Sequence, residues 1–422
     1  MTVSGTPPSV VDRRSLSRAS VLMVLGKAFQ MGFGFLFWIV AARLTSVASM
    51  GTVAATVSAV MLVTQIGLLG VGATMIVSIG RGEPPGQVLD TGFTVVTATS
   101  LLAAGGYVAV TVLGRGDVAA TQSSTPFVAM FLGAAVCGTV AICLDQACIA
   151  LGRPSGTLVR YLLGGVVMLG GLAAAAVASR GDLGAGAVFG VWTLSSVVIC
   201  VAGAVQLRRW VGYRYRGRVR IDSLRHHLAV GVPNHLLTLT ERLPALLVPL
   251  LVAYLVSPEA TAYWYPAWML AWVAYTVPIQ VGLVQFSEGV RRPAELGKTL
   301  RSGFASGLVL GGVAAAVLAV LAHPLLALIG ADYADASATA LRVLALGIIP
   351  FAIWQSYNAR CRAAGLVREG IMAGLVLAGI ICLATVWAAP RGSTALAVAW
   401  VASSSLGAIW AARRLTRRGL VR

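Results

Sequence analysis

Residues 157–206 read TLVRYLLGGVVMLGGLAAAAVASRGDLGAGAVFGVWTLSSVVICVAGAVQ and contain two long apolar runs separated by one short polar turn. Each run, 157–178 and 185–206, is close to the roughly 20 residues that an α-helix needs to cross the hydrocarbon of a bilayer. The runs are continuously apolar, whereas the strands of a membrane β-barrel alternate between apolar and polar residues. Because a helix satisfies its backbone hydrogen-bonding groups internally, the stretch predicts two consecutive transmembrane helices.

The same pattern extends along the whole chain of 422 residues, of which 58% are hydrophobic and 11% are charged. Soluble domains carry about 25% charged residues, so this composition excludes a water-soluble protein. We predict an all-α, polytopic membrane protein of about 12 transmembrane helices in two six-helix bundles. The other spans are expected near residues 19–42, 52–77, 92–113, 127–150, 228–253, 261–286, 303–328, 338–359, 370–389 and 395–412.

The formal net charge of +18 would suit a nucleic-acid-binding protein, but the positions of the 32 Lys and Arg residues argue against that class. With the N-terminus placed in the cytoplasm, 25 of them fall on the cytoplasmic side and 5 on the opposite side. This asymmetry follows the positive-inside rule. We therefore predict a multi-pass protein of a bacterial inner membrane, with both termini in the cytoplasm and no nucleic-acid partner.

The longest predicted cytoplasmic segment divides the spans six and six. The halves echo each other, because Asp145 and Gly152 at span four are matched by Asn358 and Gly365 at span ten. An even number of spans per half predicts a parallel repeat, as in many transporters. The predicted domains are a cytoplasmic N-terminal tail (1–18), an N-terminal six-helix bundle (19–206), a cytoplasmic basic linker (207–227), a C-terminal six-helix bundle (228–412) and a cytoplasmic C-terminal tail (413–422).

The span near 228–253 carries an unusual set of polar side chains: Asn234, His235, Thr238, Glu241 and Arg242. Asn234, Thr238 and Glu241 follow the spacing i, i+4, i+7 and so share one face of a helix. A charge at the centre of a bilayer costs at least about 2.5–3.5 kcal/mol, so Glu241 and Arg242 are expected to face a cavity or a partner. Two interpretations stay open, a cavity lining and a buried ion pair that only locks two helices together.

Span one contributes Lys27 and Gln30 on roughly one face. Lys27 lies about 12 Å deep at 1.5 Å per residue, and its long stem offers the alternative of snorkelling back to the cytoplasm. Under the predicted repeat, spans one and seven are equivalent and face each other. We therefore expect a cluster of Lys27 with Glu241 and Arg242.

Four further side chains are weaker candidates. Asp145 is a candidate ion-coupling site, with snorkelling into the interface as its alternative. Arg43, at the outer end of span one, is placed to meet a phosphate or to anchor the helix. Trp268 and Trp272 stripe span eight, where stacking on sugars competes with core packing as an explanation. The 6 cysteines show neither a disulfide framework nor zinc spacing, and we predict no metal and no cofactor.

The opening of the chain, Ser20–Arg81, consists of two apolar runs joined by Ala42-Arg43-Leu44 and Gly51, and it contains Gly67–Gly70 and Ser78–Arg81. Similar features, Gly231–Pro233 and Ser257–Tyr263, flank span seven. These motifs resemble those of the Wzx-type polysaccharide flippases in the multidrug/oligosaccharidyl-lipid/polysaccharide exporter superfamily. The usual LGPEEYG of that family is replaced here by Leu44–Gly51, LTSVASMG.

The resemblance implies two six-helix bundles around a central cavity that work by alternating access. It implies a non-enzymatic flippase that moves polyprenyl-diphosphate-linked oligosaccharides from the inner to the outer leaflet. Membrane lipids, and glycosyltransferases or a polymerase of the same pathway, are the implied partners. On this hypothesis Lys27 and Arg242 contact the diphosphate, Glu241 couples to ions or keeps the cavity neutral, and the aromatic residues of span eight contact sugar.

Two alternatives stay open. A cation-coupled multidrug exporter of the same fold predicts an acidic cavity. A membrane glycosyltransferase predicts a pair of carboxylates on the outer side, for which only Asp332 and Asp335 come close.

Overall fold

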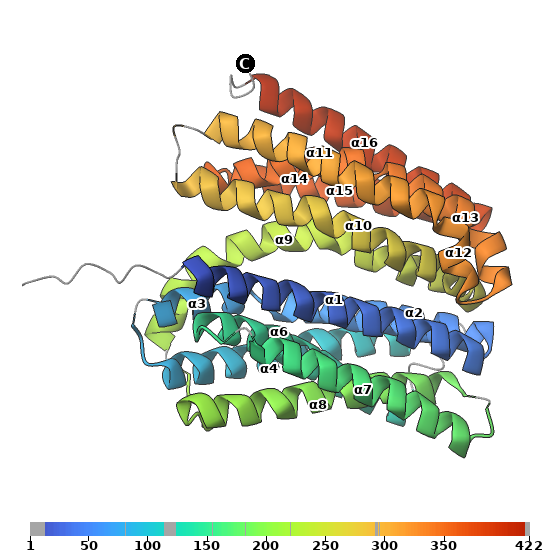
Figure 1. Cartoon of the computed structure of the whole chain (residues 1–422), viewed down its shortest axis with the longest axis horizontal. Coiled ribbons are helices and arrows are strands. Elements are labelled where there is room, and N and C mark those ends of the chain that lie inside the picture. Colours follow the sequence, from blue (N-terminus) through green and yellow to red (C-terminus); the bar gives the residue numbers. More distant parts are fainter. Residues whose placement is uncertain are drawn as a thin grey trace, which may run out of the picture.

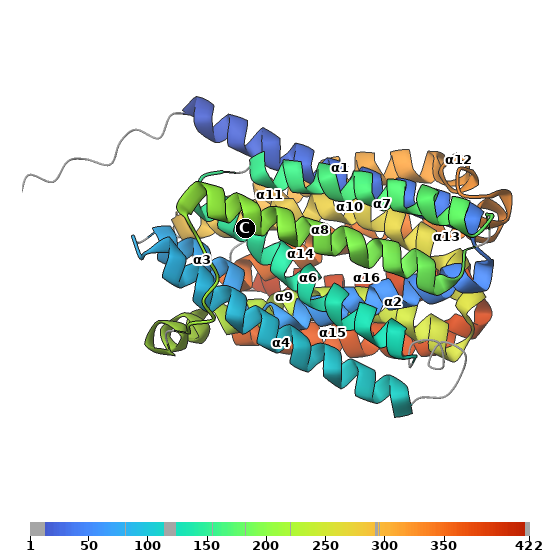
Figure 2. The same ribbon diagram turned by 90° about the horizontal axis from the view of Figure 1, so that it is seen from below.

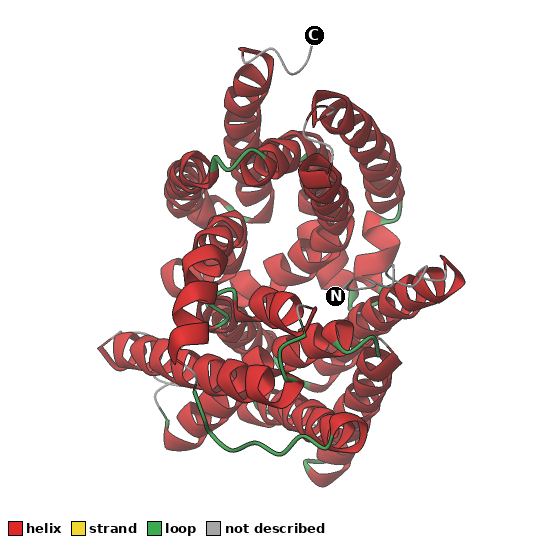
Figure 3. Cartoon of the chain, turned by 90° about the vertical axis from the view of Figure 1, so that its left-hand side faces the viewer, coloured by secondary structure: helices red, strands yellow, loops and turns green. Residues whose placement is uncertain are grey.

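The computed structural model describes residues 13–80, 82–113, 124–153, 155–181, 183–219, 221–291, 294 and 296–417. All regular secondary structure in these ranges is helical, as Figure 3 shows in a view roughly along the helices. Some side chains inside the helices lie outside the described set, among them Lys27 and residues 221–230 and 287–291. The predicted all-α class is confirmed.

Figure 1 shows the helices as two stacked groups. The first group comprises α1 (Arg13–Leu44), α2 (Val47–Gly67), α3 (Val71–Gly80), α4 (Pro85–Leu113), α6 (Thr125–Ala150), α7 (Ser155–Ala178) and α8 (Ala185–Val211). The second group comprises α9 (Ile221–Leu255), α10 (Pro258–Arg291), α11 (Leu296–Val320), α12 (Ala322–Ala327), α13 (Ala331–Leu346), α14 (Ile348–Ala363), α15 (Val367–Ala388), the short η2 (Ala389–Arg391) and α16 (Ser393–Arg417).

Ten of the described helices are long and apolar enough to cross a membrane, and the bent pair of α13 and α14 makes up to 11 spans. The first predicted span falls on α1, whose described apolar part is Phe29–Leu44. Each predicted span therefore coincides with a helix or with a pair of consecutive helices, and the polytopic architecture of about 12 spans is confirmed.

Three predicted spans are interrupted, which hydropathy did not indicate. Span 52–77 breaks between α2 and α3, where Leu69 and Gly70 have φ of 44° and 76° and cannot continue a right-handed helix. Span 303–328 breaks at Leu321, and span 338–359 bends by 42° at Gly347. The last predicted span, 395–412, is one continuous helix, α16.

The outer surface supports a membrane location. Large apolar side chains are strongly exposed on several helices, including Val177 at 83% and Leu102 at 77%. Soluble monomers rarely expose contiguous apolar patches of more than a few hundred Å². In a bilayer, these side chains contact acyl chains instead of water.

The two groups meet mainly through α2, which packs against α9 and α10. A side-chain carbon added to Gly51 of α2 would overlap the backbone of Pro258 at the start of α10, so the helices touch backbone to backbone there. In contrast, α1 packs chiefly on α7 at the edge of its own group, as Figure 2 also shows. The predicted division at 207–227 stays a prediction, and within it only Gly212–Val219 is non-helical among the described residues.

The echo between the halves has a structural counterpart in two helix ends. Both α6 and α14 end in a left-handed glycine, Gly152 with φ 66° and Gly365 with φ 69°. In both, the amide that follows the glycine donates across the last turn, from Arg153 to Cys148 and from Leu366 to Cys361, each over 2.8 Å. This is the Schellman pattern of helix termination.

Candidate functional site

An ion pair buried among the helices of the second group lies at the centre of the candidate site. Arg362 of α14 donates from Nη2 to Oε1 of Glu241 on α9 over 2.8 Å, and both side chains are only 8% exposed. The same Nη2 donates to the hydroxyl of Thr238 over 3.2 Å. Glu241 is therefore neutralised by a residue of another helix, as the cost of an isolated charge in hydrocarbon requires.

The pair borders a partly open cavity of about 60 Å³ that is lined by residues of α9, α10 and α14. A cavity of this size holds a few water molecules, because one water occupies roughly 10–15 Å³ on this measure. Its walls combine polar, charged and aromatic side chains: Thr238, Glu241, Arg242, Trp272, Ile279, Leu283, Phe351, Gln355 and Arg362.

Arg242 carries the unbalanced charge of this cavity. Its side chain is exposed, and it makes no hydrogen bond or ion pair with any of the described residues. Since Glu241 and Arg362 neutralise each other, Arg242 leaves the wall with one net positive charge. The cavity is thus suited to attract an anionic group.

The remaining polar residues of α9 have different surroundings. Nε2 of His235 lies 2.8 Å from the carbonyl oxygen of Gln65 on α2, so this ring joins the two groups of helices. Asn234 is half-buried, and its carbonyl oxygen accepts from Thr238. Of the predicted polar face, Thr238, Glu241 and Arg242 reach the cavity.

The predicted cluster of Lys27 with Glu241 and Arg242 stays a prediction. The side chain of Lys27 lies outside the described residues, and Glu241 is paired with Arg362. Gln30, also on α1, hydrogen-bonds Tyr161 of α7. The described part of α1 therefore joins a polar network of the first group.

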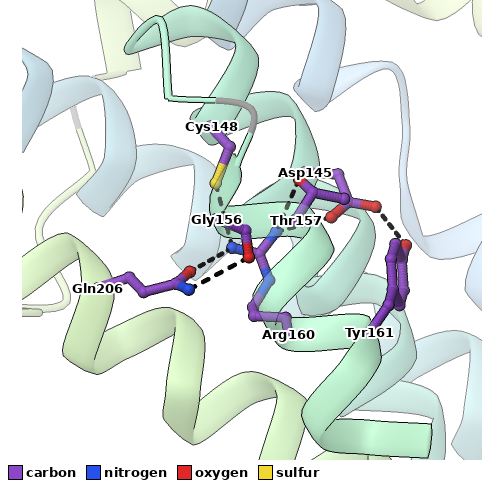
Figure 4. Close-up of polar contacts among 7 residues, drawn as sticks. All are labelled: Asp145, Cys148, Gly156, Thr157, Arg160, Tyr161 and Gln206. Atoms are coloured by element: carbon purple, nitrogen blue, oxygen red, sulfur yellow. Dashed lines mark hydrogen bonds and ion pairs between the residues drawn. The ribbon is translucent and has the colours of Figure 1, made fainter. Parts of the chain in front are cut away.

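Figure 4 shows that network around Asp145. Nη2 of Arg160, a side chain only 1% exposed, donates to Asp145 over 2.7 Å, and the hydroxyl of Tyr161 donates to the other carboxylate oxygen over 2.5 Å. Gln206 of α8 accepts from Arg160 over 2.7 Å and donates to the carbonyl of Gly156 over 3.1 Å. The network joins α6, α7 and α8, and both oxygens of the predicted ion-coupling carboxylate are occupied.

The aromatic stripe of α10 divides between core and cavity. Trp268 is 3% exposed, packs edge-on against Trp400 with ring centroids 4.6 Å apart, and donates to the carbonyl of Ala245. It therefore does not line the cavity, contrary to the predicted sugar contact. Trp272, one turn further along the helix, does line it.

Arg43 has a partner at the other end of the molecule from the strongly basic segments. Its Nη2 donates over 2.8 Å to the carbonyl of Leu328, next to α12 in the second group. Trp38, also on α1, contacts Tyr265 of α10, with ring centroids 4.8 Å apart. Together with the contact of Gly51 and Pro258, these interactions hold the two groups together at this end.

Three participants were missed by the sequence analysis. Arg160 and Arg362 are among the 25 basic residues that we assigned to the cytoplasmic side, but each lies within a helix and forms a buried ion pair. Gln355 was not singled out. The available signal was the spacing of Phe351, Gln355 and Arg362 at i, i+4 and i+11, which continues one helical face beyond the expected end at residue 359.

No protein-family model matches this chain, and no curated protein matches it. Solved structures do. An inward-facing multidrug-resistance MATE transporter of the MOP superfamily has a TM-score of 0.70 and 14% identity, covering 94% of this chain and 98% of that chain. An outward-facing MATE transporter of the superfamily has a TM-score of 0.67 at 14% identity, covering 96% of each chain.

A third structure is a MOP superfamily transporter from Pyrococcus furiosus, described as having a binding pocket of reverse polarity that suggests a different function. Its TM-score is 0.65 at 14% identity, with 96% of each chain covered. Identities this low show the fold alone, and the finer resemblance to Wzx-type flippases stays a prediction. This chain has the fold of the MATE transporters of the MOP superfamily.

Proposed function

We propose that this chain is a flippase that moves a polyprenyl-diphosphate-linked oligosaccharide from the inner to the outer leaflet of a bacterial cell membrane. The observation that carries the proposal is the unneutralised Arg242 on the wall of a cavity between α9, α10 and α14. A diphosphate cannot cross hydrocarbon unaided, and a guanidinium is well suited to bind phosphate oxygens through several donors.

The other polar groups of the cavity support this assignment. Thr238 and Gln355 offer neutral hydrogen-bonding groups beside Arg242, and Trp272 offers a ring face to a sugar. Arg362 lines the same cavity, so its guanidinium can release Glu241 and bind a phosphate oxygen of a substrate instead. Such an exchange releases the Glu241 carboxylate to take up a proton or a cation, which links substrate binding to ion binding.

The two groups of helices touch toward both ends. On the side of the basic segments, a side-chain carbon added to Gly70 would lie 2.7 Å from the carbonyl oxygen of Gly231, and His235 contacts Gln65. Arg43 with Leu328, and Gly51 with Pro258, close the end that the positive-inside rule assigns to the outer face. In our proposal, alternating access breaks the contacts of one end at a time, and for release the contacts that break are those of the outer face. Rocking of the two groups then breaks these contacts and opens the cavity to the outer leaflet.

The alternative is a cation-coupled multidrug exporter, which the names of the structural neighbours favour. An exporter of cationic drugs needs a net negative cavity, whereas the described ionisable groups here sum to one positive charge. The Pyrococcus furiosus transporter is described as having a binding pocket of reverse polarity that suggests a different function. The sign of the pocket's charge is therefore a useful criterion for function within this fold.

The deciding experiment is reconstitution of the full chain in vesicles. Translocation of a fluorescent polyprenyl-diphosphate-linked oligosaccharide is compared with uptake of an organic cation such as ethidium. We expect translocation of the lipid-linked sugar and its loss in the Arg242→Gln variant. Transport of ethidium alone, driven by a cation gradient, would replace the flippase by the exporter.

A further inference from the structure

The connection between α8 and α9, residues Gly212–Val219, runs beside α4 (Figure 2). The carboxylate of Asp90 on α4 holds it there. Asp90 of α4 accepts from the backbone amide of Arg216 over 2.7 Å and from that of Arg218 over 2.8 Å. It also accepts from the hydroxyl of Tyr213 over 3.2 Å. Asp90 is only 5% exposed because this segment, called the strap below, covers it.

Arginine occupies every second position of the strap from 214 to 218, and the two tyrosines, at 213 and 215, contact α4. The sequence of the strap from 213 to 218 is Tyr-Arg-Tyr-Arg-Gly-Arg. The tyrosines hold it to α4: the ring of Tyr213 lies 6.0 Å from that of Phe93, and the hydroxyl of Tyr215 lies 3.1 Å from that of Thr94. Burial and the neighbouring Asp90 raise the pKa of Tyr213, so its hydroxyl stays protonated and continues to donate.

The three arginines of the strap point to solvent or lipid. Arg214, Arg216 and Arg218 are all exposed, and none of them takes part in an ion pair among the described residues. Gly217 has φ 65°, so the backbone turns between Arg216 and Arg218, and the three side chains belong to one segment of five residues. The strap therefore displays three exposed guanidinium groups that have no ion-pair partner in the described part of the chain.

The position of the strap along α4 indicates its depth relative to the bilayer. Eleven residues make about three helical turns, so Asp90 and the exposed Leu101 lie on the same face, roughly 16 Å apart along the axis. That separation equals about half of the roughly 30 Å hydrocarbon thickness. Acyl chains packed on Leu101 and the neighbouring Leu102 would therefore place their headgroups at the strap.

We propose that the strap is a docking site for the phosphate headgroups of anionic phospholipids in the leaflet facing it. Its three arginines bind the headgroup phosphates, and the exposed apolar face of α4 receives the acyl chains. Asp90 contributes by holding the backbone, so it acts as a positioning residue. The site is separate from the cavity of α9, α10 and α14 and does not depend on what that cavity transports.

The test is native mass spectrometry of the full chain in detergent, titrated with phosphatidylglycerol or phosphatidylcholine. Each arginine near an anionic surface contributes about fivefold to binding, so Arg214→Gln, Arg216→Gln and Arg218→Gln together should reduce the preference for phosphatidylglycerol on the order of 100-fold. The matched control removes three other exposed arginines, Arg342, Arg368 and Arg413, by the same substitution. An equal loss in the control would overturn the proposal.

Two further arms separate the strap from general charge attraction. Asp90→Asn keeps all three arginines but weakens the anchor, and we expect it to lower the preference for phosphatidylglycerol. If this variant keeps both its preference for phosphatidylglycerol and its thermal midpoint, the proposal that the anchored strap positions the arginines for headgroup binding is refuted. Inorganic pyrophosphate is the second probe: tight binding of this free anion, with no gain from acyl chains, would also overturn the lipid assignment.

Discussion

The charge balance of the cavity leads to a prediction that separates recognition from folding. Arg242→Gln removes an exposed cation that has no ion-pair partner among the described residues, so no buried charge is left behind. A hydrogen bond to a charged group contributes about 1.5–3 kcal/mol. Since 1.4 kcal/mol corresponds to a factor of ten, we expect the apparent affinity for the diphosphate lipid to fall about 10- to 100-fold. The thermal midpoint should change little.

The ion pair of Glu241 and Arg362 gives the opposite pattern. Breaking a buried pair by removing one partner costs about 3–5 kcal/mol, and both side chains here are almost fully buried. Arg362→Gln should therefore destabilise the protein by that amount, and so should Glu241→Gln. In the double variant no buried charge is unpaired, and its loss of stability should be smaller than the sum of the two single losses.

The double variant is the decisive member of this series. Its cavity keeps Arg242 and thus the same net charge as the native protein. We expect it to bind the fluorescent polyprenyl-diphosphate-linked oligosaccharide more tightly than Arg242→Gln does, because it loses only the phosphate contact of Arg362 and keeps the net charge of the cavity. Unfolding followed by tryptophan fluorescence supplies the stability of each variant. If the double variant stays folded and loses as much affinity as Arg242→Gln, the net charge does not govern recognition and our reasoning is refuted.

Four other variants test the remaining assignments. Gly51→Val places a side chain where the backbone of Pro258 lies, so it should separate α2 from α10 at the outer end. We expect cysteines introduced at that end to be labelled faster, and unchanged labelling would contradict the close contact of the two helices. Asp145→Ala leaves Arg160 buried and unpaired and should cost about 3–5 kcal/mol in thermal unfolding, whereas a loss below about 1 kcal/mol contradicts a tight network. Trp268→Ala should cost about 3–5 kcal/mol of stability, and Trp272→Ala should mainly weaken substrate binding; the reverse result contradicts the division between core and cavity.

The spans could be predicted because hydrocarbon imposes a length and a composition on every helix that crosses it. Their interruptions could not, because they depend on local backbone conformation. At Leu69 and Gly70 two consecutive residues have positive φ, and only the glycine has an intrinsic preference for it. Hydropathy averages over such a pair without a signal.

The site was predicted in part for an equally physical reason. Glu241 and Arg242 stood out because ionised groups in an apolar run are costly, but their surroundings depend on a helix 121 residues away in sequence. The tryptophans illustrate the effect of helical geometry. Each step of four residues advances about 40° around the helix, so Trp264 and Trp268 lie in the core and only Trp272 reaches the cavity.

The two halves end equivalent helices in the same way but place charge differently before those ends. Seven residues before its terminal glycine, α6 has Asp145, which is held by Arg160 and Tyr161, and α14 has the neutral Asn358. Three residues before the glycine, α6 has the apolar Ile149, whereas α14 has Arg362 at the cavity. The repeat therefore supplies a common frame, and a few substitutions within it decide its use. At these equivalent helix ends, the first half pairs Asp145 with Arg160 inside its own group. The second half instead pairs Arg362 with Glu241 beside Arg242, which has no ion-pair partner among the described residues and is available to a substrate.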